Sequence, residues 1–463
     1  GYVYWILGFI TFLIPGAIVT GQLGLMFPGE GSIYVWTTKA LGAFMGFFAG
    51  FCAWWPGVLV MIATGDAVTA LIQQLGAQID PANAWLAAPW QQGLVIVLVI
   101  AFSAFLSVLR FRVTQNFVNT IFVAYGGAIV LIGIAGLLSI LGGHAAAVDY
   151  SAPAWELNGK NVTFYATVIL ALLGIEVPLN MGVEVKEVRA ITRYLLWGSV
   201  VVMVAYLLGT FGVMSAVPVS DQGSPAAIAE AVSRGFGGGF GSALGILVSI
   251  IFIGFFIFNT AVYNYSFGRL LFVSGLDRRL PAVMSKVNKN RVPWVAVVVQ
   301  SSISVIFTIV AFILAPSFAA SPGDLSTIIY DILQAAVTVI WCVSMVVLFV
   351  DVIIIRHKFA DTFARVRLAP TWVFYVCATI GALATAYGVY ATFTGPWTAL
   401  LSERVWVLWI GGIVVLSLLA GAVLFFIGQA STKGELSDEQ IIATVTGGGD
   451  QPPTSADPSP SDA

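Results

Sequence analysis

The residues most able to do chemistry in this sequence lie in one short run, Leu173-Gly174-Ile175-Glu176-Val177-Pro178-Leu179-Asn180-Met181-Gly182. Glu176 is an acid inside an otherwise apolar segment, and it stands between Gly174 and Pro178. In a helix interior, glycine costs about 1 kcal/mol and proline about 3 kcal/mol, and Pro178 also removes the hydrogen bond to the carbonyl of Gly174. The run therefore predicts a broken helix with residues 173–178 non-helical; a packed proline kink is the alternative.

A helix that is broken inside a membrane has a definite chemical use. One half-helix end leaves free carbonyls and the other leaves free amides, and hydrocarbon tolerates them only where they line a cavity enclosed by protein. Such ends suit the ammonium and carboxylate groups of a zwitterion. The candidate substrate-binding residues are Leu170, Ala171, Leu173, Gly174 and Ile175 around the break, with Asn259 and Tyr263 from a later segment.

Two acids inside apolar segments, Glu176 and Asp66, are the candidate coupling or gating residues. A buried carboxylate without a partner is strongly disfavoured, and no lysine or arginine within the apolar segments can pair with Glu176. Glu176 must then be protonated, hydrated by the cavity, or bonded to amides that the break frees. The first two states suit a proton carrier, and the third makes Glu176 a capping residue. For Asp66 the alternative is an interfacial or capping position, and Asp331 and Asp351 are expected to reach water.

Other polar residues of one later segment leave two interpretations open. Asn259, Tyr263 and Ser266 fall on one helix face at positions i, i+4 and i+7. Thr260 pairs with Asn264 one step round the same helix. These side chains either line a cavity or an ion site, or they form hydrogen bonds between helices.

The elements that position these residues follow from the composition. The 463 residues include 20 Lys and Arg and 22 Asp and Glu, and 59% of the chain is hydrophobic. Eleven windows lack all four charged residue types, and ten of them reach the length of about 20 residues that a spanning helix needs. The windows are too long for barrel strands of about 10 residues. We therefore predict an all-α, multi-pass membrane protein, which excludes a soluble enzyme, a nucleic-acid binder and a disulfide scaffold.

No catalytic or metal-binding pattern accompanies the broken segment. Cys52, Cys342 and Cys377 lie inside apolar windows, and His144 and His357 lie in loops. The sequence holds no HExxH or GxSxG motif and no cluster of His, Cys and carboxylates on one segment. We expect no enzymatic activity, no metal and no cofactor.

The basic residues of the connecting loops predict the orientation in the membrane. Seventeen of the 20 lysines and arginines fall on one set of alternate loops, and the other set holds only Lys160, Arg234 and Arg404. By the positive-inside rule the first set is cytoplasmic, in the plasma (inner) membrane, together with the C-terminus. Residues 1–430 then form the transmembrane domain, and the acidic, Gly- and Pro-containing segment 431–463 is a disordered cytoplasmic tail.

The same orientation places the first residue outside the cell. Gly1 is not a methionine, and the apolar run Tyr2–Ile14 begins directly after it. We expect at least one spanning helix to precede residue 1, and we expect a chain without that helix not to transport. The alternative is a native protein of eleven helices with an external N-terminus.

Three signatures, in order along the chain, resemble those of one transporter family. Phe27-Pro28-Gly29-Glu30-Gly31-Ser32-Ile33-Tyr34-Val35-Trp36 resembles its P-x-x-G-[GS]-x-Y-x-W loop, and Gly174-Ile175-Glu176 followed by Glu184-Val185-Lys186 resembles its G-[FV]-E and E-x-K elements. Ser266–Leu271, Asp277–Pro281 and Val292-Pro293 resemble its S-x-x-R-x-L, D-G-x-L-P and x-P stretch. The chain thus resembles the amino acid-polyamine-organocation family from residue 1 to about residue 428.

The resemblance implies the fold and the function together. It implies the LeuT-like fold of two inverted five-helix repeats plus two further helices, of which eleven of twelve helices are present and the first is missing. It also implies that the first and sixth helices are both interrupted and face each other across the substrate. At Leu170 the sequence departs from members with an aromatic gate, and at Phe122 from members whose lysine couples protons.

Secondary active transport by alternating access is the function that these features favour. The expected substrate is an amino acid or a related amine, and the expected partners are the lipid bilayer and a coupled proton or counter-substrate, without nucleic acid. The alternative is a transport-inactive scaffold or a channel-like protein. A channel needs a ring of charges or carbonyls along a pore, and one broken helix does not supply that ring.

Overall fold

A computed structural model describes seven ranges of the chain: 2–109, 111–146, 155–157, 163–182, 188–224, 226–318 and 321–431. The E-x-K element at 184–186 lies outside the described residues. So does the acidic segment that the sequence predicts to be a tail, except for Ser431, which ends the last helix.

The first half of the chain forms six helical spans and one short helix at the end of the molecule. The helix α1 (Tyr2–Gly8), the π-helical turn η1 (Phe9–Leu13) and α2 (Ile14–Met26) continue one another as the first span. They are followed by α3 (Ser32–Leu41), α4 (Ala43–Ile79), α5 (Pro89–Val108), α6 (Phe111–Leu141), α7 (Thr163–Leu172), the 3-10 helix η3 (Val177–Asn180) and α8 (Val188–Ala216).

The second half adds five spans and several short elements. In chain order these are η5 (Val219–Asp221), α9 (Ala227–Phe236), α10 (Gly238–Leu276), η6 (Ala282–Ser285), α11 (Trp294–Thr308), the π-helical η7 (Ile309–Leu314), α12 (Ala315–Ser317), α13 (Pro322–Lys358), α14 (Ala360–Arg365), α15 (Thr371–Phe393) and α16 (Glu403–Ser431). Eleven helices within the described residues are long and apolar enough to cross a membrane. The prediction of an all-α membrane protein with eleven spans is therefore confirmed.

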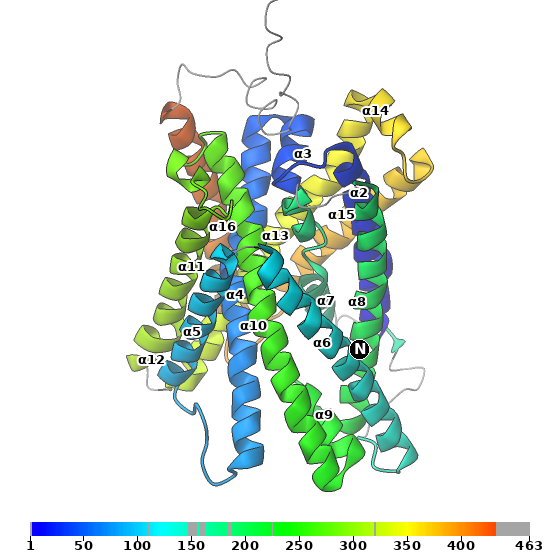
Figure 1. Ribbon diagram of the computed structural model, residues 1–463, viewed down its shortest axis with the longest axis vertical. Helices are drawn as coiled ribbons and strands as arrows, with labels where there is room; N and C mark the ends of the chain where they lie inside the picture. The colour runs from blue at the N-terminus through cyan, green and yellow to red at the C-terminus, as the bar shows by residue number, and fades with distance from the viewer. Residues whose placement is uncertain are drawn as a thin grey trace, which may run out of the picture.

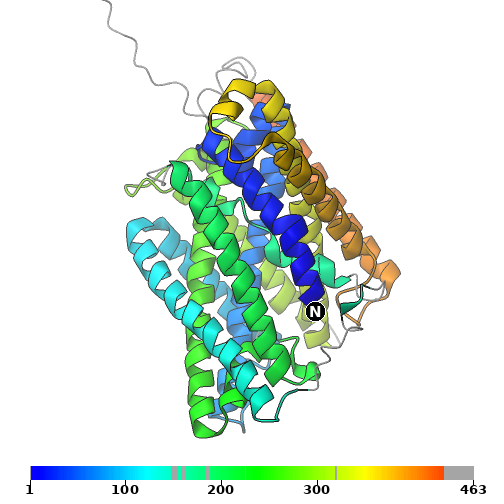
Figure 2. The same cartoon turned by 90° about the vertical axis from the view of Figure 1, so that its right-hand side faces the viewer.

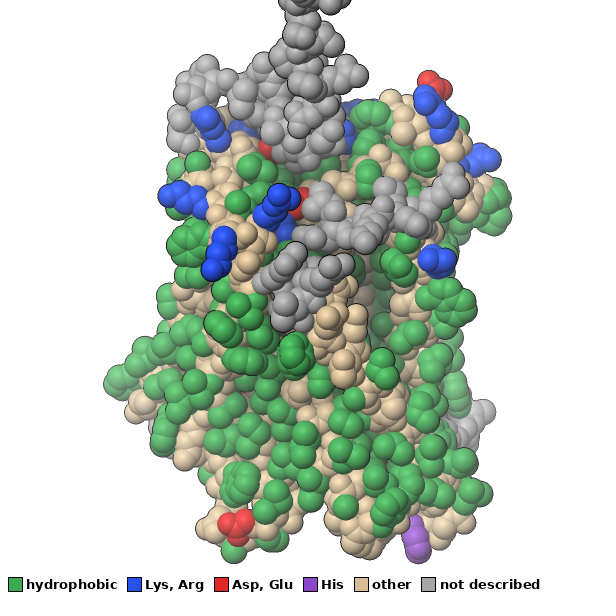
Figure 3. All heavy atoms as spheres, viewed as in Figure 1, with side chains coloured by type: hydrophobic (Ala, Val, Ile, Leu, Met, Phe, Trp, Pro, Cys, Tyr) green, Lys and Arg blue, Asp and Glu red, His purple; other side chains and the backbone are tan. Residues whose placement is uncertain are grey.

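The two ends of the molecule differ in charge. Figure 1 shows α3 and α14 at the upper end and α9 at the lower end, and Figure 3 shows lysines and arginines gathered at the upper end of the same view. We call the end with α3 and α14 the basic end. Between the two ends the visible surface is mostly apolar, as a surface that faces lipid must be.

Long helices from both halves of the chain form the core. The helix α10 packs against α4, α5, α6 and α9, and α13 packs against α3, α4, α15 and α16. Figure 2 shows the first span running obliquely toward the basic end. Glycine allows the closest approach between α6 and α8, because a Cβ atom at Gly212 would lie 2.2 Å from the carbonyl oxygen of Ile132.

A buried polar network joins four of these helices. Trp54 of α4 donates to the side chain of Gln300 on α11 at 3.0 Å, and Gln300 donates in turn to Asn264 of α10 at 2.5 Å. Asn264 donates to Ser301 of α11 at 2.8 Å and to Ser103 of α5 at 3.4 Å. Of the two interpretations left open for Asn264, the structure supports hydrogen bonds between helices.

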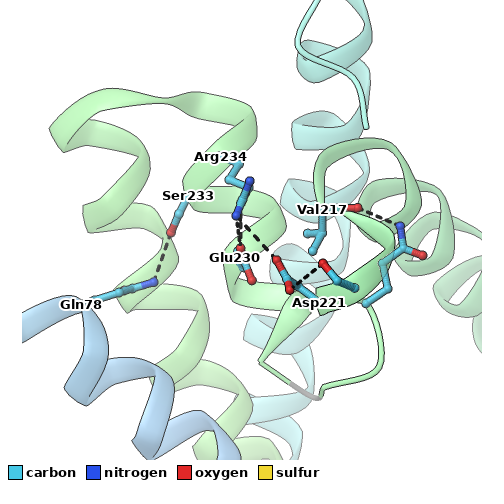
Figure 4. A network of polar contacts seen from close by, with 8 residues as sticks. Gln78, Val217, Asp221, Glu230, Ser233 and Arg234 are labelled. Carbon is cyan, nitrogen blue, oxygen red and sulfur yellow. Dashed lines mark hydrogen bonds and ion pairs between the residues drawn. The ribbon is translucent and has the colours of Figure 1, made fainter. Parts of the chain in front are cut away.

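The end opposite the basic end is held by a small ionic network around α9 (Figure 4). Arg234 lies 2.6 Å from Glu230 one helical turn away and 3.8 Å from Asp221 in η5. Gln78, near the end of α4, donates to Ser233 at 3.4 Å. These contacts tie α9 to the extended end of α4 and to the loop before α9.

Candidate functional site

The broken helix lies where the sequence predicts it. The helix α7 ends at Leu172, Gly174 has φ of +101°, and a short 3-10 helix begins at Val177. Residues 173–176 are non-helical, so the predicted break is confirmed. The predicted non-helical range, 173–178, was two residues too long, because Val177 and Pro178 begin the 3-10 helix. A proline is tolerated there, since the first residues of a helix do not need an amide donor.

The break leaves backbone groups without partners. Among the described residues, no hydrogen bond satisfies the amides of Gly174 and Ile175 or the carbonyls of Leu172, Leu173 and Ile175. Unpaired amides and carbonyls therefore stand within a few residues of each other. This is the arrangement that can bind the carboxylate and the ammonium of one small molecule.

Glu176 is fully buried beside the break and is bound by an indole. Trp341 of α13 donates from its Nε1 atom to Oε1 of Glu176 at 2.8 Å. The other oxygen, Oε2, is buried and has no hydrogen-bond partner in the part of the chain that the structure describes. Sequence reasoning missed Trp341, because 165 positions separate it from Glu176 and tryptophans are common in apolar segments.

Aromatic rings cover the break on the side of α10 and α13. The indole of Trp341 lies next to Gly174, where a Cβ atom would stand 3.4 Å from two of its carbons. Phe267 meets Trp341 edge to face at 5.7 Å, and Tyr263 stacks on Phe267 at 5.8 Å. Tyr263 and Asn259, one turn apart on α10, share a side-chain hydrogen bond. The candidate residue Tyr263 thus belongs to a row of aromatic rings that ends beside the break.

The remaining candidate residues of the broken segment have different surroundings. Tyr206 of α8 donates to the carbonyl of Ala171 at 2.9 Å, so this carbonyl is already occupied. Ile175 faces Gly16 of α2, where a Cβ atom would lie 3.2 Å from its side chain. Leu170 is partly buried against the apolar core.

Asp66 lies away from Glu176, near a second acidic residue, Asp331. It is close enough to Asp331 and Tyr330 of α13 to interact with them electrostatically. Asp331 precedes Trp341 by ten residues, which is about 15 Å along a helix. Asp66 and Asp331 are both partly exposed. That Asp331 reaches water stays a prediction.

One expectation about an acid is wrong. Asp351, expected to reach water at the end of its segment, has no exposed surface. The reason is α3, a short helix that covers α13 at the basic end and whose Thr37 donates to Asp351 at 2.5 Å. The helix pattern of one segment does not reveal which other helix will cover its end.

A polar latch connects the broken segment to the basic end. It consists of Glu30, Ser32, Asn180, Ser266 and Arg269. Ser32 donates to the side chain of Asn180 at 2.6 Å, and Ser266 donates to the carbonyl of Val177 at 2.7 Å. Arg269 of α10 forms an ion pair with Glu30 at 2.6 Å, and its side chain is only 4% exposed.

The latch places the loop before α3 between the broken segment and α10. The amide of Gly31 donates to the carbonyl of Asn180 at 3.3 Å, and Glu30 forms an isolated β-bridge with Met181. One feature of the sequence pointed to this contact: Glu30 is the only charged residue of the motif at 27–36, and Arg269 is the only one of the motif at 266–271. The sequence alone did not show that the two residues pair.

A third acid at the basic end lies outside the spanning segments. Tyr34 of α3 donates to Asp277 at 2.5 Å, just after α10. Burial raises the pKa of Asp277 to about 7, although the hydrogen bond from Tyr34 and the nearby charge of Arg279 act in the opposite direction. Burial also lowers the pKa of Lys39 on α3.

The raised pKa of Asp277 predicts how stability depends on pH. An unfolded chain releases this proton near pH 3.8, whereas the folded protein keeps it up to about pH 7. The folded state binds more protons between these values, so stability should fall as the pH rises, by at most about 1.4 kcal/mol per pH unit for one site. Melting temperatures of the wild type and of Asp277→Asn between pH 4 and 8 will test this, and an equal slope in both would contradict it.

The fold and the site together define a class of protein. An all-α protein with eleven possible spans, one of them broken at a buried carboxyl, is a multi-pass membrane protein of the transporter kind. The sequence profile of the amino acid permease family matches residues 1–427. The chain belongs to this family, and its function class is secondary transport of amino acids or amines.

Proteins of similar sequence are also named as transporters. An uncharacterized transporter of Legionella pneumophila is 25% identical over 337 residues, which cover 70% of this chain and 69% of that protein. The probable agmatine/putrescine antiporter AguD of Lactococcus lactis is 21% identical, with coverage of 67% and 66%. The probable GABA permease of Pseudomonas aeruginosa is 23% identical, with coverage of 71% and 70%. The chain thus spans about two thirds of the length of these relatives.

Proposed function

We propose that this protein carries an amino acid or a small amine across the plasma membrane by alternating access. The break at 173–176 binds the ammonium and carboxylate groups, and the basic end, with the C-terminus, faces the cytoplasm. No enzymatic step is part of the proposal. The single observation that carries it is the set of unpaired amides and carbonyls at the break, next to the buried carboxyl of Glu176.

The substrate-binding groups of the proposal come from three elements. Backbone groups of Leu173, Gly174 and Ile175 hold the charged ends of the substrate. Tyr263, with Asn259 beside it, and the aromatic row from α10 to α13 form the wall that meets the remainder of the substrate. Leu170 and Ala171 line the end of α7 that leads to the break.

Counterflow in liposomes tests the proposal directly. The purified product of the full-length gene is reconstituted with unlabelled substrate inside, and uptake of labelled zwitterionic amino acids, GABA, agmatine and putrescine is measured. Accumulation of at least one compound, with competition by its unlabelled form, is expected. Equal leakage of all compounds would indicate a channel, and no uptake of any would favour the transport-inactive scaffold.

Glu176 is the proposed coupling residue, and its replacement gives a specific prediction. In Glu176→Gln the amide oxygen can still accept the hydrogen bond from Trp341, but the group no longer titrates. We expect the variant to exchange substrate while its rate loses the pH dependence of the wild type. Rates of counterflow between pH 5 and 8 provide the measurement.

Glu403→Gln is the matched control for this substitution. Glu403 is exposed at the start of α16 and loses the same charge. The control should keep the wild-type pH profile. An unchanged profile in Glu176→Gln would assign Glu176 to a capping role instead, and Asp66→Asn, measured in the same way, tests the other candidate coupling residue.

A further inference from the structure

The short helix α3 is fixed to the basic end through a fully buried carboxyl. Thr37 of α3 and Asp351 of α13 have no exposed surface, and the Thr37 hydroxyl donates to Oδ2 of Asp351. The other oxygen of Asp351, Oδ1, is buried and has no partner within the described residues. Nothing in the proposed substrate site uses this group.

The cations at the same end bind elsewhere. Lys358, two turns after Asp351 on α13, donates to the carbonyl of Ala40 at 2.7 Å. Lys39 of α3 lies over the ring of Phe27, 4.7 Å from its centre. In the described parts of the chain no ion pair includes Asp351, and neither Arg356 nor the exposed Asp361 and Arg365 of α14 is within pairing distance.

Apart from α3 and α14, the helices that pack on α13 bring no charged residue to the half of α13 that contains Asp351. The charged residue of α4 within the membrane, Asp66, interacts with Asp331, twenty residues before Asp351. The charged residues of α16, Glu403 and Arg404, lie at its opposite end, and α15 has none. Cys52, on the neighbouring helix α4, is also buried and titratable, but its thiol form is uncharged.

An ionised Asp351 is incompatible with these surroundings. One neutral hydroxyl donor does not compensate the loss of water around a carboxylate, and no cation is there to do so. A protonated carboxyl meets the constraint, because its charge is gone and its carbonyl oxygen accepts the hydrogen bond from Thr37. When α3 leaves α13, water reaches Asp351 and the carboxyl ionises.

We propose that α3 is a pH-sensitive switch, whose docking onto α13 takes up one proton from the water at the basic end and places it on Asp351. Undocking returns the proton to the same side, so a complete cycle moves no proton across the membrane. The switch thus regulates the closing of the basic end, whereas Glu176 is proposed to couple transport. It depends on the proposed function only in that α3 moves.

The distance between α3 and the loop after α14 reports docking without any transport measurement. Spin labels are attached to cysteines at Leu41 and Val366, two exposed positions at the basic end, after Cys52, Cys342 and Cys377 are replaced by serine. We expect one distance population at pH 5.5 and a second, longer one that grows as the pH rises to 8.5. All variants, the wild type included, are measured in an Asp277→Asn background, because Asp277 accepts a hydrogen bond from Tyr34 of α3 and its pKa of about 7 lies in the same range. In this background Asp351→Asn should keep the short population over the whole range.

Two further variants keep the experiment decisive. Asp361→Asn removes an exposed carboxylate at the same end and should leave the pH dependence unchanged. Thr37→Val removes one hydrogen bond from the docked state, which weakens docking by up to about tenfold and lowers the midpoint by up to about one pH unit. The switch would be refuted if the wild-type distances did not change with pH, or if Asp351→Asn kept the wild-type pH dependence. A failure of the proposed transport function alone would leave these distances unchanged.

Discussion

Replacing Arg269 by methionine is expected to open the basic end of the protein and to reduce substrate counterflow about 100-fold. The guanidinium is 4% exposed and pairs with Glu30, whose side chain is 16% exposed, at 2.6 Å. Removal of one partner from a buried ion pair costs about 3–5 kcal/mol, because the other charge stays buried without it. Even the lower value shifts an equilibrium between closed and open states by more than 100-fold.

The location of the pair explains why this cost acts on transport. Glu30 is in the loop that binds the carbonyl and side chain of Asn180, three residues after Val177. Ser266, on the same helix as Arg269, binds the carbonyl of Val177. Loss of the ion pair therefore weakens the attachment of the broken segment's second half, and the protein should rest with its basic end open.

Two comparisons separate this effect from a general loss of stability. The double variant Glu30→Met/Arg269→Met removes both charges, and an apolar replacement of a buried pair is often neutral for stability, so its closed population should recover. Arg278→Met removes an exposed arginine at the same end and should behave like the wild type. Spin-label distances between positions 41 and 366 and counterflow rates are the two measurements. Wild-type values for both in Arg269→Met would refute the latch.

The fold could be predicted from the sequence because a bilayer imposes a simple length and composition rule. Charge-free windows of about 20 residues have few folded solutions in lipid, and the eleven spans follow from them. The helix α3 was not predicted, because a helix of ten residues that includes Ser32, Thr37, Thr38 and Lys39 has neither that length nor that composition. Its absence from the prediction caused the error at Asp351.

The site could be predicted only in its local part. Gly174 and Pro178 are incompatible with a regular helix, so the break was visible in six consecutive residues. Trp341 was not, since a partner 165 residues away is brought to Glu176 by the packing of α13 and not by any local pattern. The same limit applies to Asn264, whose pattern fitted a cavity as well as the hydrogen bonds between helices that the structure contains.

Trp341→Phe should reduce counterflow by about 100-fold and should lower the melting temperature. The substitution keeps an aromatic ring beside Gly174 and Phe267, but it removes the Nε1 donor to Glu176. The buried Glu176 carboxyl would then keep only the contact with its own backbone amide, and Oε2 has no partner in the described structure. An unsatisfied buried polar group costs about 1–3 kcal/mol, and the smaller ring adds a cavity next to the break.

The matched control is another buried tryptophan with the same kind of hydrogen bond. Trp406 of α16 has no exposed surface and donates to the carbonyl of Thr392 at 2.9 Å, away from the break. Trp406→Phe should lower the melting temperature to a similar extent while counterflow of the folded protein stays within a few-fold of the wild type. Equal losses of counterflow in the two variants would mean that Trp341 acts only through stability.

A second substitution at Glu176 separates stability from function at the site itself. Trp341→Phe/Glu176→Met removes donor and acceptor together, and replacing both partners by apolar groups of similar shape can be nearly neutral for stability. The double variant should regain most of the melting temperature lost in Trp341→Phe, yet its counterflow should remain low, because methionine, unlike the glutamine of Glu176→Gln, leaves no polar side chain beside the break. Recovery of both quantities would show that the pair of Trp341 and Glu176 serves packing alone, and the coupling role proposed for Glu176 would then be untenable.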